Sequence, residues 1–246
     1  MTRLPKLASL AILASLSVAT PALADSMLFN AGDIGRSITL DYNGFSGNGG
    51  ASISGLTGST TFTLTGVSGN NYSFAYTVNN TTSAPVTGSR ISSFAFNTDP
   101  TITGASSTGA YSYTQLSSNY PNGIGTVDVC FKDATTGSCA GGGSGGLTAG
   151  QSGTGDFTLS FAAPVSALTL SDFYVRYQSI TGVAGVTSAS GAGSISSSTS
   201  STSGGSTTGG TDVPEPGMLG LFGAGIIGLA LARRRRSALR LPVAAA

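Results

Sequence analysis

The chain has 246 residues, which allows one sandwich-sized domain with processing segments at its ends. Only 9% of the residues are charged, against roughly 25% in an ordinary soluble domain, and the sequence contains no His and no Trp. The lack of His excludes a Ser-His-Asp triad and an imidazole metal site, and nine Asp against four basic residues between Asp25 and Asp212 argue against a nucleic-acid partner.

Residues 1–24 have the form of a secretory signal peptide. Two basic residues precede a short apolar run, which ends before an A-x-A site at Ala22 and Ala24. These are the three parts of a signal that signal peptidase cleaves. The apolar run is short for a permanent membrane anchor. We therefore predict a signal-peptide helix that is removed by cleavage between Ala24 and Asp25.

Seven runs in the middle of the chain place apolar or aromatic residues at every second position. They are residues 37–42, 60–67, 72–79, 90–98, 126–131, 156–162 and 172–179. A period of two predicts strands with one buried face, and the Gly, Asn, Ser and Pro residues between the runs mark turns. With no helical period between the two ends, residues 25–186 are predicted to form an all-β, antiparallel sandwich of jelly-roll type.

The predicted core consists of the large apolar residues of these runs, each contributing roughly 1.5–3 kcal/mol when buried. The candidates are Phe62, Leu64, Phe74, Tyr76, Phe94, Phe96, Val127, Val129, Phe157, Leu159, Phe161, Phe173 and Val175.

Cys130 and Cys139 are the only cysteines. In an exported chain, two cysteines this close together favour a disulfide across a hairpin-like loop, worth about 3 kcal/mol at best. A metal or redox pair is the alternative, but the spacing is not C-x-x-C and the chain has no His.

Residues 187–212 are almost entirely Ser, Gly, Thr and Ala. Such a composition predicts a flexible linker with no core of its own. Its mean reach would be on the order of 25–30 Å, which would hold the folded domain clear of a membrane.

Residues 213–236 combine a Pro-Glu-Pro triplet, an uncharged apolar run at 217–232 and a block of four arginines. A helix over the apolar run would be about 24 Å long, so it would only marginally span a hydrocarbon core of ~30 Å. The arginines should stay in the cytoplasm, which places the triplet outside the membrane. The residues assigned to this signal are Pro214, Glu215, Pro216, Arg233, Arg234, Arg235 and Arg236.

This order of triplet, apolar helix and basic block resembles the PEP-CTERM sorting signal of Gram-negative bacteria, a segment also labelled the ice-binding protein C-terminal domain. The resemblance implies transient anchoring in the inner membrane and cleavage near the triplet by an exosortase. Residues 237–246 would be a cytoplasmic tail, although members of that family usually stop soon after the basic block. Stretches such as "LDYNGFSG" and "YPNGIGTVDVCFK" within residues 38–186 resemble the cistern family of PEP-CTERM proteins, which implies no activity.

No catalytic residue, metal ligand or cofactor is predicted. The aspartates are scattered and lack the paired context of a glycosidase. Asp99, Asp128 and Asp133 do not have the spacing of a calcium loop. A non-enzymatic cell-surface or extracellular-matrix protein is therefore the leading hypothesis, with signal peptidase and exosortase as its processing partners.

The main alternative is a secreted polysaccharide-binding module that holds exopolysaccharide through Tyr, Asn and Asp on its loops. A hydrolase and an ice-binding protein are disfavoured. Thr61, Thr63 and Thr65 project from one strand face, as in flat ice-binding surfaces, but a repeating ladder of such strands is not expected from the sequence.

Overall fold

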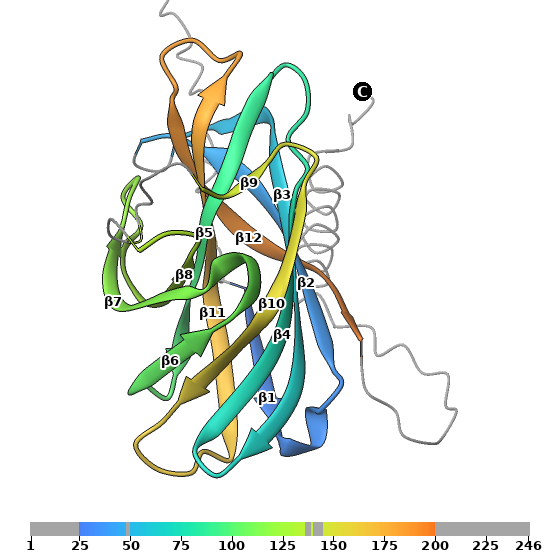
Figure 1. Ribbon diagram of the computed structural model, residues 1–246, viewed down its shortest axis with the longest axis vertical. Helices are drawn as coiled ribbons and strands as arrows, with labels where there is room; N and C mark the ends of the chain where they lie inside the picture. The colour runs from blue at the N-terminus through green and yellow to red at the C-terminus, as the bar shows by residue number, and fades with distance from the viewer. Residues whose placement is uncertain (1–24, 48–49, 136–138, 140–144, 200–246) are drawn as a thin grey trace, which may run out of the picture. The chain divides into compact units, whose positions relative to one another are not determined.

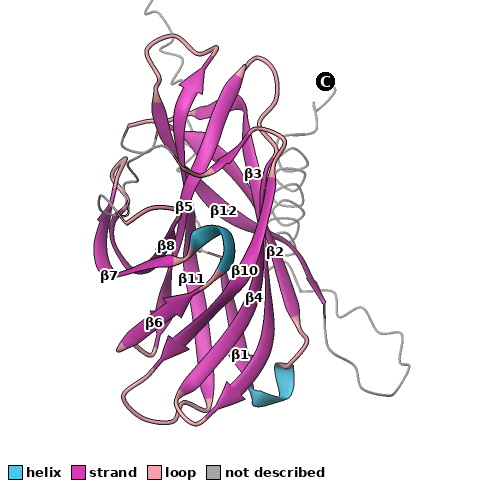
Figure 2. Cartoon of the chain, viewed as in Figure 1, coloured by secondary structure: helices cyan, strands magenta, loops and turns pink. Residues whose placement is uncertain are grey.

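The computed structural model describes residues 25–47, 50–135, 139 and 145–199, and in this part the chain is almost wholly β (Figures 1 and 2). The strands are β1 (Ser26–Asn30), β2 (Ser37–Phe45), β3 (Ser52–Ser68), β4 (Asn71–Asn80), β5 (Gly88–Asp99), β6 (Gly104–Ser107), β7 (Tyr113–Tyr120), β8 (Gly125–Lys132), β9 (Leu147–Thr148), β10 (Ser152–Ser160), β11 (Ala167–Thr181) and β12 (Ser188–Thr199). Two short 3₁₀ helices cover Ala31–Asp33 and Gly109–Tyr111.

None of the helices in these described ranges is long and apolar enough to cross a membrane. The predicted signal-peptide helix within 1–24 and the predicted transmembrane helix 217–232 lie outside the described residues.

All of the strands belong to one antiparallel sheet. Its order is β6-β10-β4-β3-β2-β12-β11-β5-β8-β7, with β1 added to β11 and β9 added to β5. The sheet curls until its two end strands meet, and the Thr114 hydroxyl of β7 donates to the Ala105 carbonyl of β6 at 3.2 Å. The predicted all-β antiparallel class is confirmed, with a single sheet folded over on itself in place of two separate sheets.

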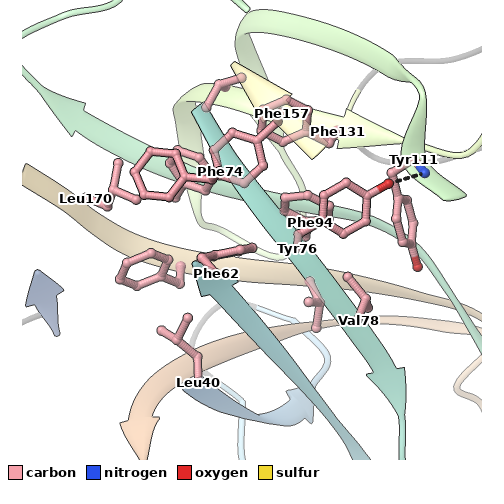
Figure 3. Close-up of a cluster of buried hydrophobic side chains, with 14 of the residues drawn as sticks. Leu40, Phe62, Phe74, Tyr76, Val78, Phe94, Tyr111, Phe131, Phe157 and Leu170 are labelled. Atoms are coloured by element: carbon pink, nitrogen blue, oxygen red, sulfur yellow. Dashed lines mark hydrogen bonds between the residues drawn. The ribbon is translucent and has the colours of Figure 1, made fainter. Parts of the chain in front are cut away.

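The core lies between the inner surfaces of this sheet, and all thirteen predicted core residues are buried. Aromatic rings form its centre (Figure 3). The ring centroids of Phe74 and Phe157 are 5.0 Å apart, those of Phe94 and Phe131 are 5.0 Å apart, and Phe62 lies 5.5 Å from Phe157. Aromatic pairs of this kind add about 0.5–1.5 kcal/mol each beyond their buried area.

The predicted linker 187–212 is wrong for residues 188–199, which form β12 between β2 and β11. The inward positions 191 and 193 of β12 are glycines because large side chains of the neighbouring strands lie beneath them. A Cβ on Gly191 would lie 2.9 Å from Val175 and 3.0 Å from the Tyr177 ring. The folded domain therefore extends to Thr199 rather than residue 186, and residues 200–212 lie outside the described residues.

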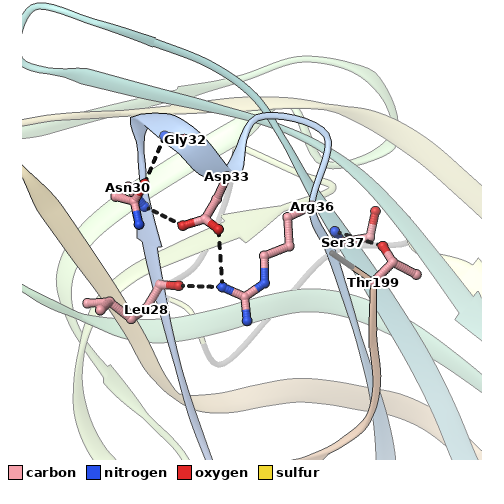
Figure 4. Close-up of polar contacts among 7 residues, drawn as sticks. All are labelled: Leu28, Asn30, Gly32, Asp33, Arg36, Ser37 and Thr199. Atoms are coloured by element: carbon pink, nitrogen blue, oxygen red, sulfur yellow. Dashed lines mark hydrogen bonds and ion pairs between the residues drawn. The ribbon is translucent and has the colours of Figure 1, made fainter. Parts of the chain in front are cut away.

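Strand β1 was also not predicted. It pairs with β11, and the buried Phe29 ring meets the Phe74 ring edge-on at 5.1 Å. The turn into β2 is held by a capping box (Figure 4). The backbone amide of Asn30 donates to the Asp33 carboxylate at 2.9 Å, and the backbone amide of Gly32 donates to the side-chain Oδ1 of Asn30 at 2.8 Å. Reciprocal bonds of this kind satisfy the free donors at a helix start, so they fix the path of the chain between the two strands.

Candidate functional site

The predicted sorting residues, Pro214 to Pro216 and Arg233 to Arg236, lie outside the described residues, as do Ala22 and Ala24 of the predicted signal cleavage site. Asp25, the predicted first residue of the mature chain, is described. Its carboxylate accepts a hydrogen bond from the Ile195 amide at 2.6 Å, and β1 begins at the next residue. The start of the described domain is thus attached directly to its last strand.

The other end of the domain is attached in the same region. Thr199 ends β12, and its hydroxyl accepts a hydrogen bond from the Ser37 amide at 3.2 Å (Figure 4). The described domain therefore begins and ends at residues that contact β12 or belong to it.

The predicted disulfide between Cys130 and Cys139 is confirmed, with their Cα atoms 6.1 Å apart. Both cysteines are fully buried in a small second cluster that also contains Ala95, Tyr120 and Val127. We call these five residues the outer cluster, because Ala95 points away from the aromatic core between the inward-facing rings of its neighbours. The predicted core residue Val127 therefore packs here rather than in the main core.

A buried arginine fixes the β7–β8 turn beside this cluster. Arg176 on β11 donates to Asn122 Oδ1 at 2.6 Å and to the Ser188 hydroxyl at 2.8 Å, and the Ser190 hydroxyl donates to the same Asn122 oxygen at 2.9 Å. Burial lowers the pKa of the Arg176 guanidinium. The arrangement ties the turn to β11 and β12, so its role is structural.

The aspartates considered as calcium ligands do not form a shared site. Asp128 accepts from the Thr98 amide at 2.8 Å, whereas burial raises the pKa of the Asp133 carboxyl against the opposing charges of Arg90 and Lys132. Within the part of the chain that the structure describes, no three Cys, Asp or Glu residues gather as a metal site would require.

A largely polar surface lies on the outer side of strands β12, β2, β3, β4 and β10. We call its polar part the hydroxyl face, and it consists of Ser194, Ser197, Thr199, Ser37, Thr39, Asp41, Asn43, Thr57, Ser59, Thr61, Thr63, Thr65, Ser73, Ala75, Thr77, Asn79, Ser152, Thr154, Asp156 and Thr158. Ala192 on β12 and the half-buried Phe45 at the end of β2 are outside it. Along β2, β3 and β4 these residues alternate with buried ones, most of them core side chains.

The hydroxyl face contains a ladder that was not expected from the sequence. Ser197 pairs with Thr39, Thr39 with Thr61, Thr61 with Thr77 and Thr77 with Thr154, so one row of hydroxyls crosses five strands. Within this row the hydroxyls of Thr39 and Thr61 bond to each other at 3.0 Å. The sequence did not reveal this row, because strand register is not visible in one strand's sequence. No other strand of the face repeats the Thr-x-Thr-x-Thr pattern of β3.

The comparison with known families bears on the other end of the chain. A family model of the PEP-CTERM protein-sorting motif matches residues 212–236. The chain carries a PEP-CTERM sorting motif. The motif implies export, transient membrane anchoring and processing by an exosortase. No curated protein and no solved structure matches the chain, so the cistern-family resemblance of the middle domain stays a prediction.

The PEP-CTERM motif and the described domain are close in sequence. The motif begins at residue 212 and β12 ends at Thr199. Sequence reasoning found the motif and the disulfide. It missed β12 and the Arg176–Asn122 contact, although Ala189, Gly191, Gly193 and Ile195 alternate with mostly polar residues, which is a signal for a strand.

Proposed function

We propose that the chain is a non-enzymatic protein of the cell surface or extracellular matrix, delivered by a signal peptide and released from a transient membrane anchor by an exosortase. The observation that carries this proposal is the PEP-CTERM motif at 212–236, which follows closely on a complete β-domain. A Gram-negative host, a transmembrane helix at 217–232 and signal-peptidase cleavage before Asp25 are parts of the same proposal.

The short connection between domain and motif supports processing close to the membrane. Pro214 follows Thr199 by fifteen positions, and a fully extended chain of that length spans about 50 Å at most. The β-domain would therefore remain close to the membrane until the chain is cut at the triplet.

Charge supplies the orientation of the anchor. Each arginine costs on the order of 2.5–3.5 kcal/mol at the centre of a membrane span, so four in a row would stay on the cytoplasmic side. With the apolar run inserted, Pro214, Glu215 and Pro216 would lie near the outer interface. The two prolines keep that segment out of a helix and accessible to a membrane protease.

The test replaces Pro214, Glu215 and Pro216 by alanine in a host with an exosortase and in one without it. We expect export to continue and a longer, membrane-bound form to accumulate, as measured by fractionation and intact mass. Pro242→Ala, in the predicted cytoplasmic tail, is the matched control and should be processed like the wild type. Release of the triplet variant with the wild-type C-terminus would refute the proposal.

The other end is tested by sequencing the N-terminus of the exported protein. We expect it to begin at Asp25. A chain that begins at Met1, or far from Asp25, would contradict the signal-peptide part of the proposal and leave the sorting part standing.

A further inference from the structure

The hydroxyl face presents its side chains as a two-dimensional array. Neighbouring strands lie about 4.7–4.9 Å apart, and successive outward residues on one strand lie about 6.6–6.8 Å apart. The spacing is interrupted on β12 by a register shift between Ile195 and Ser197 and on β3 by one between Leu64 and Gly66. Ser and Thr fill most positions, Asn43 and Asn79 add amides, and the two charged members, Asp41 and Asp156, are both exposed carboxylates. The surface is therefore polar, regular and weakly acidic.

The hydroxyls of this array keep bonding capacity for a ligand. Ser37 bonds to Thr63 at 2.6 Å, Thr39 to Thr61 at 3.0 Å, and Ser73 to Thr158 at 3.0 Å. Each hydroxyl has one donor and two acceptor positions, so a bonded pair retains one donor and three acceptors. The pairing holds the side chains in place without using up their polar groups.

The composition of the face decides which partner it fits. Protein interfaces have aromatic, Met and Arg residues at their centre and are depleted in Ser and Asp, and the hydroxyl face has none of the former. Nucleic acids and anionic polymers need cations, and the face has no basic residue. Membrane surfaces need an apolar or basic side. A neutral polymer rich in hydroxyl groups matches both the donors and acceptors of the array and its carboxylates, which accept hydrogen bonds strongly.

We propose that the hydroxyl face binds a neutral polysaccharide, laid across β12, β2, β3, β4 and β10. The proposal rests on the proposed function, since it names the partner that a surface or matrix protein would hold. With no aromatic ring in the array, each sugar is held weakly. Affinity comes from many contacts along one chain, so long polymers bind and single sugars do not.

The experiment uses the exported protein and measures its depletion from solution by insoluble cellulose, insoluble β-1,3-glucan, raw starch granules and cross-linked alginate. We expect retention on at least one of the three neutral polymers, none on anionic alginate, and no weakening by salt, because no ion pair is involved. Free glucose should not compete.

The face variant is Thr39→Val, Thr61→Val and Thr77→Val together, which keeps the branched shape of each side chain and removes three hydroxyls of the central row. We expect about a tenfold loss of binding, as expected for several contacts removed from one array. The matched control is Thr126→Val, Thr169→Val and Thr181→Val on β8 and β11, which should bind like the wild type. If the face variant does not fold, Thr77→Lys replaces it, with the same expected loss.

Three outcomes would overturn the proposal: no retention of the wild type on any neutral polymer, equal binding by the face variant, or adsorption to ice without binding to any polymer. None of these affects C-terminal processing, which is measured separately by intact mass. Failure of this proposal and failure of the sorting proposal are therefore distinguishable.

Discussion

The two sides of strands β3 and β4 differ sharply in composition and contacts. On the inner side, Phe62 and Phe74 are fully buried among other aromatic rings. One residue away, Thr61 and Ser73 point outward and bond to hydroxyls of adjacent strands. The inner side is specified by volume and apolar area, whereas the outer side is specified by register. On these two strands, substitutions at inward, even-numbered positions should therefore alter stability, and substitutions at outward, odd-numbered positions should alter surface chemistry.

The largest expected effect comes from removing β12. A chain that ends at residue 187 would leave β2 and β11 without their shared neighbour and expose Tyr42 and Tyr177 on the inner side. We expect loss of cooperative unfolding, as measured by circular dichroism during heating. A chain that ends at residue 200 is the control and should unfold cooperatively. Equal behaviour of the two chains would show that β12 is dispensable.

The next largest effect is expected from a substitution on the inner side of β10, compared with one at the neighbouring outward residue. Phe157→Ala should cost about 3–5 kcal/mol of unfolding free energy, because it leaves a cavity among the aromatic rings. Thr158→Ala, one residue further on, removes only an outward hydroxyl bonded to Ser73 and should cost about 1 kcal/mol or less. Urea denaturation of both variants measures the difference, and similar costs would contradict the division into two sides.

The outer cluster should have an intermediate effect. Replacing Cys130 and Cys139 together by alanine opens the loop and should cost about 2–3 kcal/mol. The main core should persist, since its aromatic contacts do not involve either cysteine. Denaturant titration gives the cost, and near-ultraviolet circular dichroism follows the aromatic packing. Loss of the packed aromatic signal would mean that the two clusters are not independent.

Alkaline pH has a gradual effect that is absent at neutral pH. Burial raises the pKa of the Tyr42, Tyr111, Tyr120 and Tyr177 phenols above the ordinary value of 10.0. Above pH 10 the unfolded chain loses these protons and the folded chain keeps them, so stability is complete below pH 10 and falls as pH rises above it. The slope should be about 1.4 kcal/mol per pH unit for each tyrosine.

Urea denaturation at successive pH values measures this slope. Tyr120→Phe should reduce it by one tyrosine's share. A wild-type stability that stays constant from pH 9 to 11 would refute the assignment of these phenols to a buried, protonated state.

The parts of the structure that the sequence predicted are those encoded locally. Residues 72–79 and 90–98 alternate large and polar side chains, so their strands and buried faces were visible without a partner. The PEP-CTERM motif was visible for a related reason: its triplet, apolar run and basic block stand in a fixed linear order.

The rest depended on non-local pairing. Positions 191 and 193 of β12 are glycines because they lie against Tyr42, which comes from a strand far away in the sequence. Likewise, the row from Ser197 to Thr154 exists only once five strands are in register. Composition alone made β12 look like a linker, and one strand alone could not show a ladder.

The position of β12 has a consequence for export. The last strand of the domain to cross the membrane is inserted between β2 and β11, near the middle of the strand order. If the N-terminus crosses first, β2 emerges long before β12. The two strands pair residues as far apart in the sequence as Ser37 and Thr199. A topology with such high contact order folds slowly. The chain would thus stay unfolded enough to pass through the membrane. The sheet would be completed only when β12, the strand next to the sorting motif, has crossed.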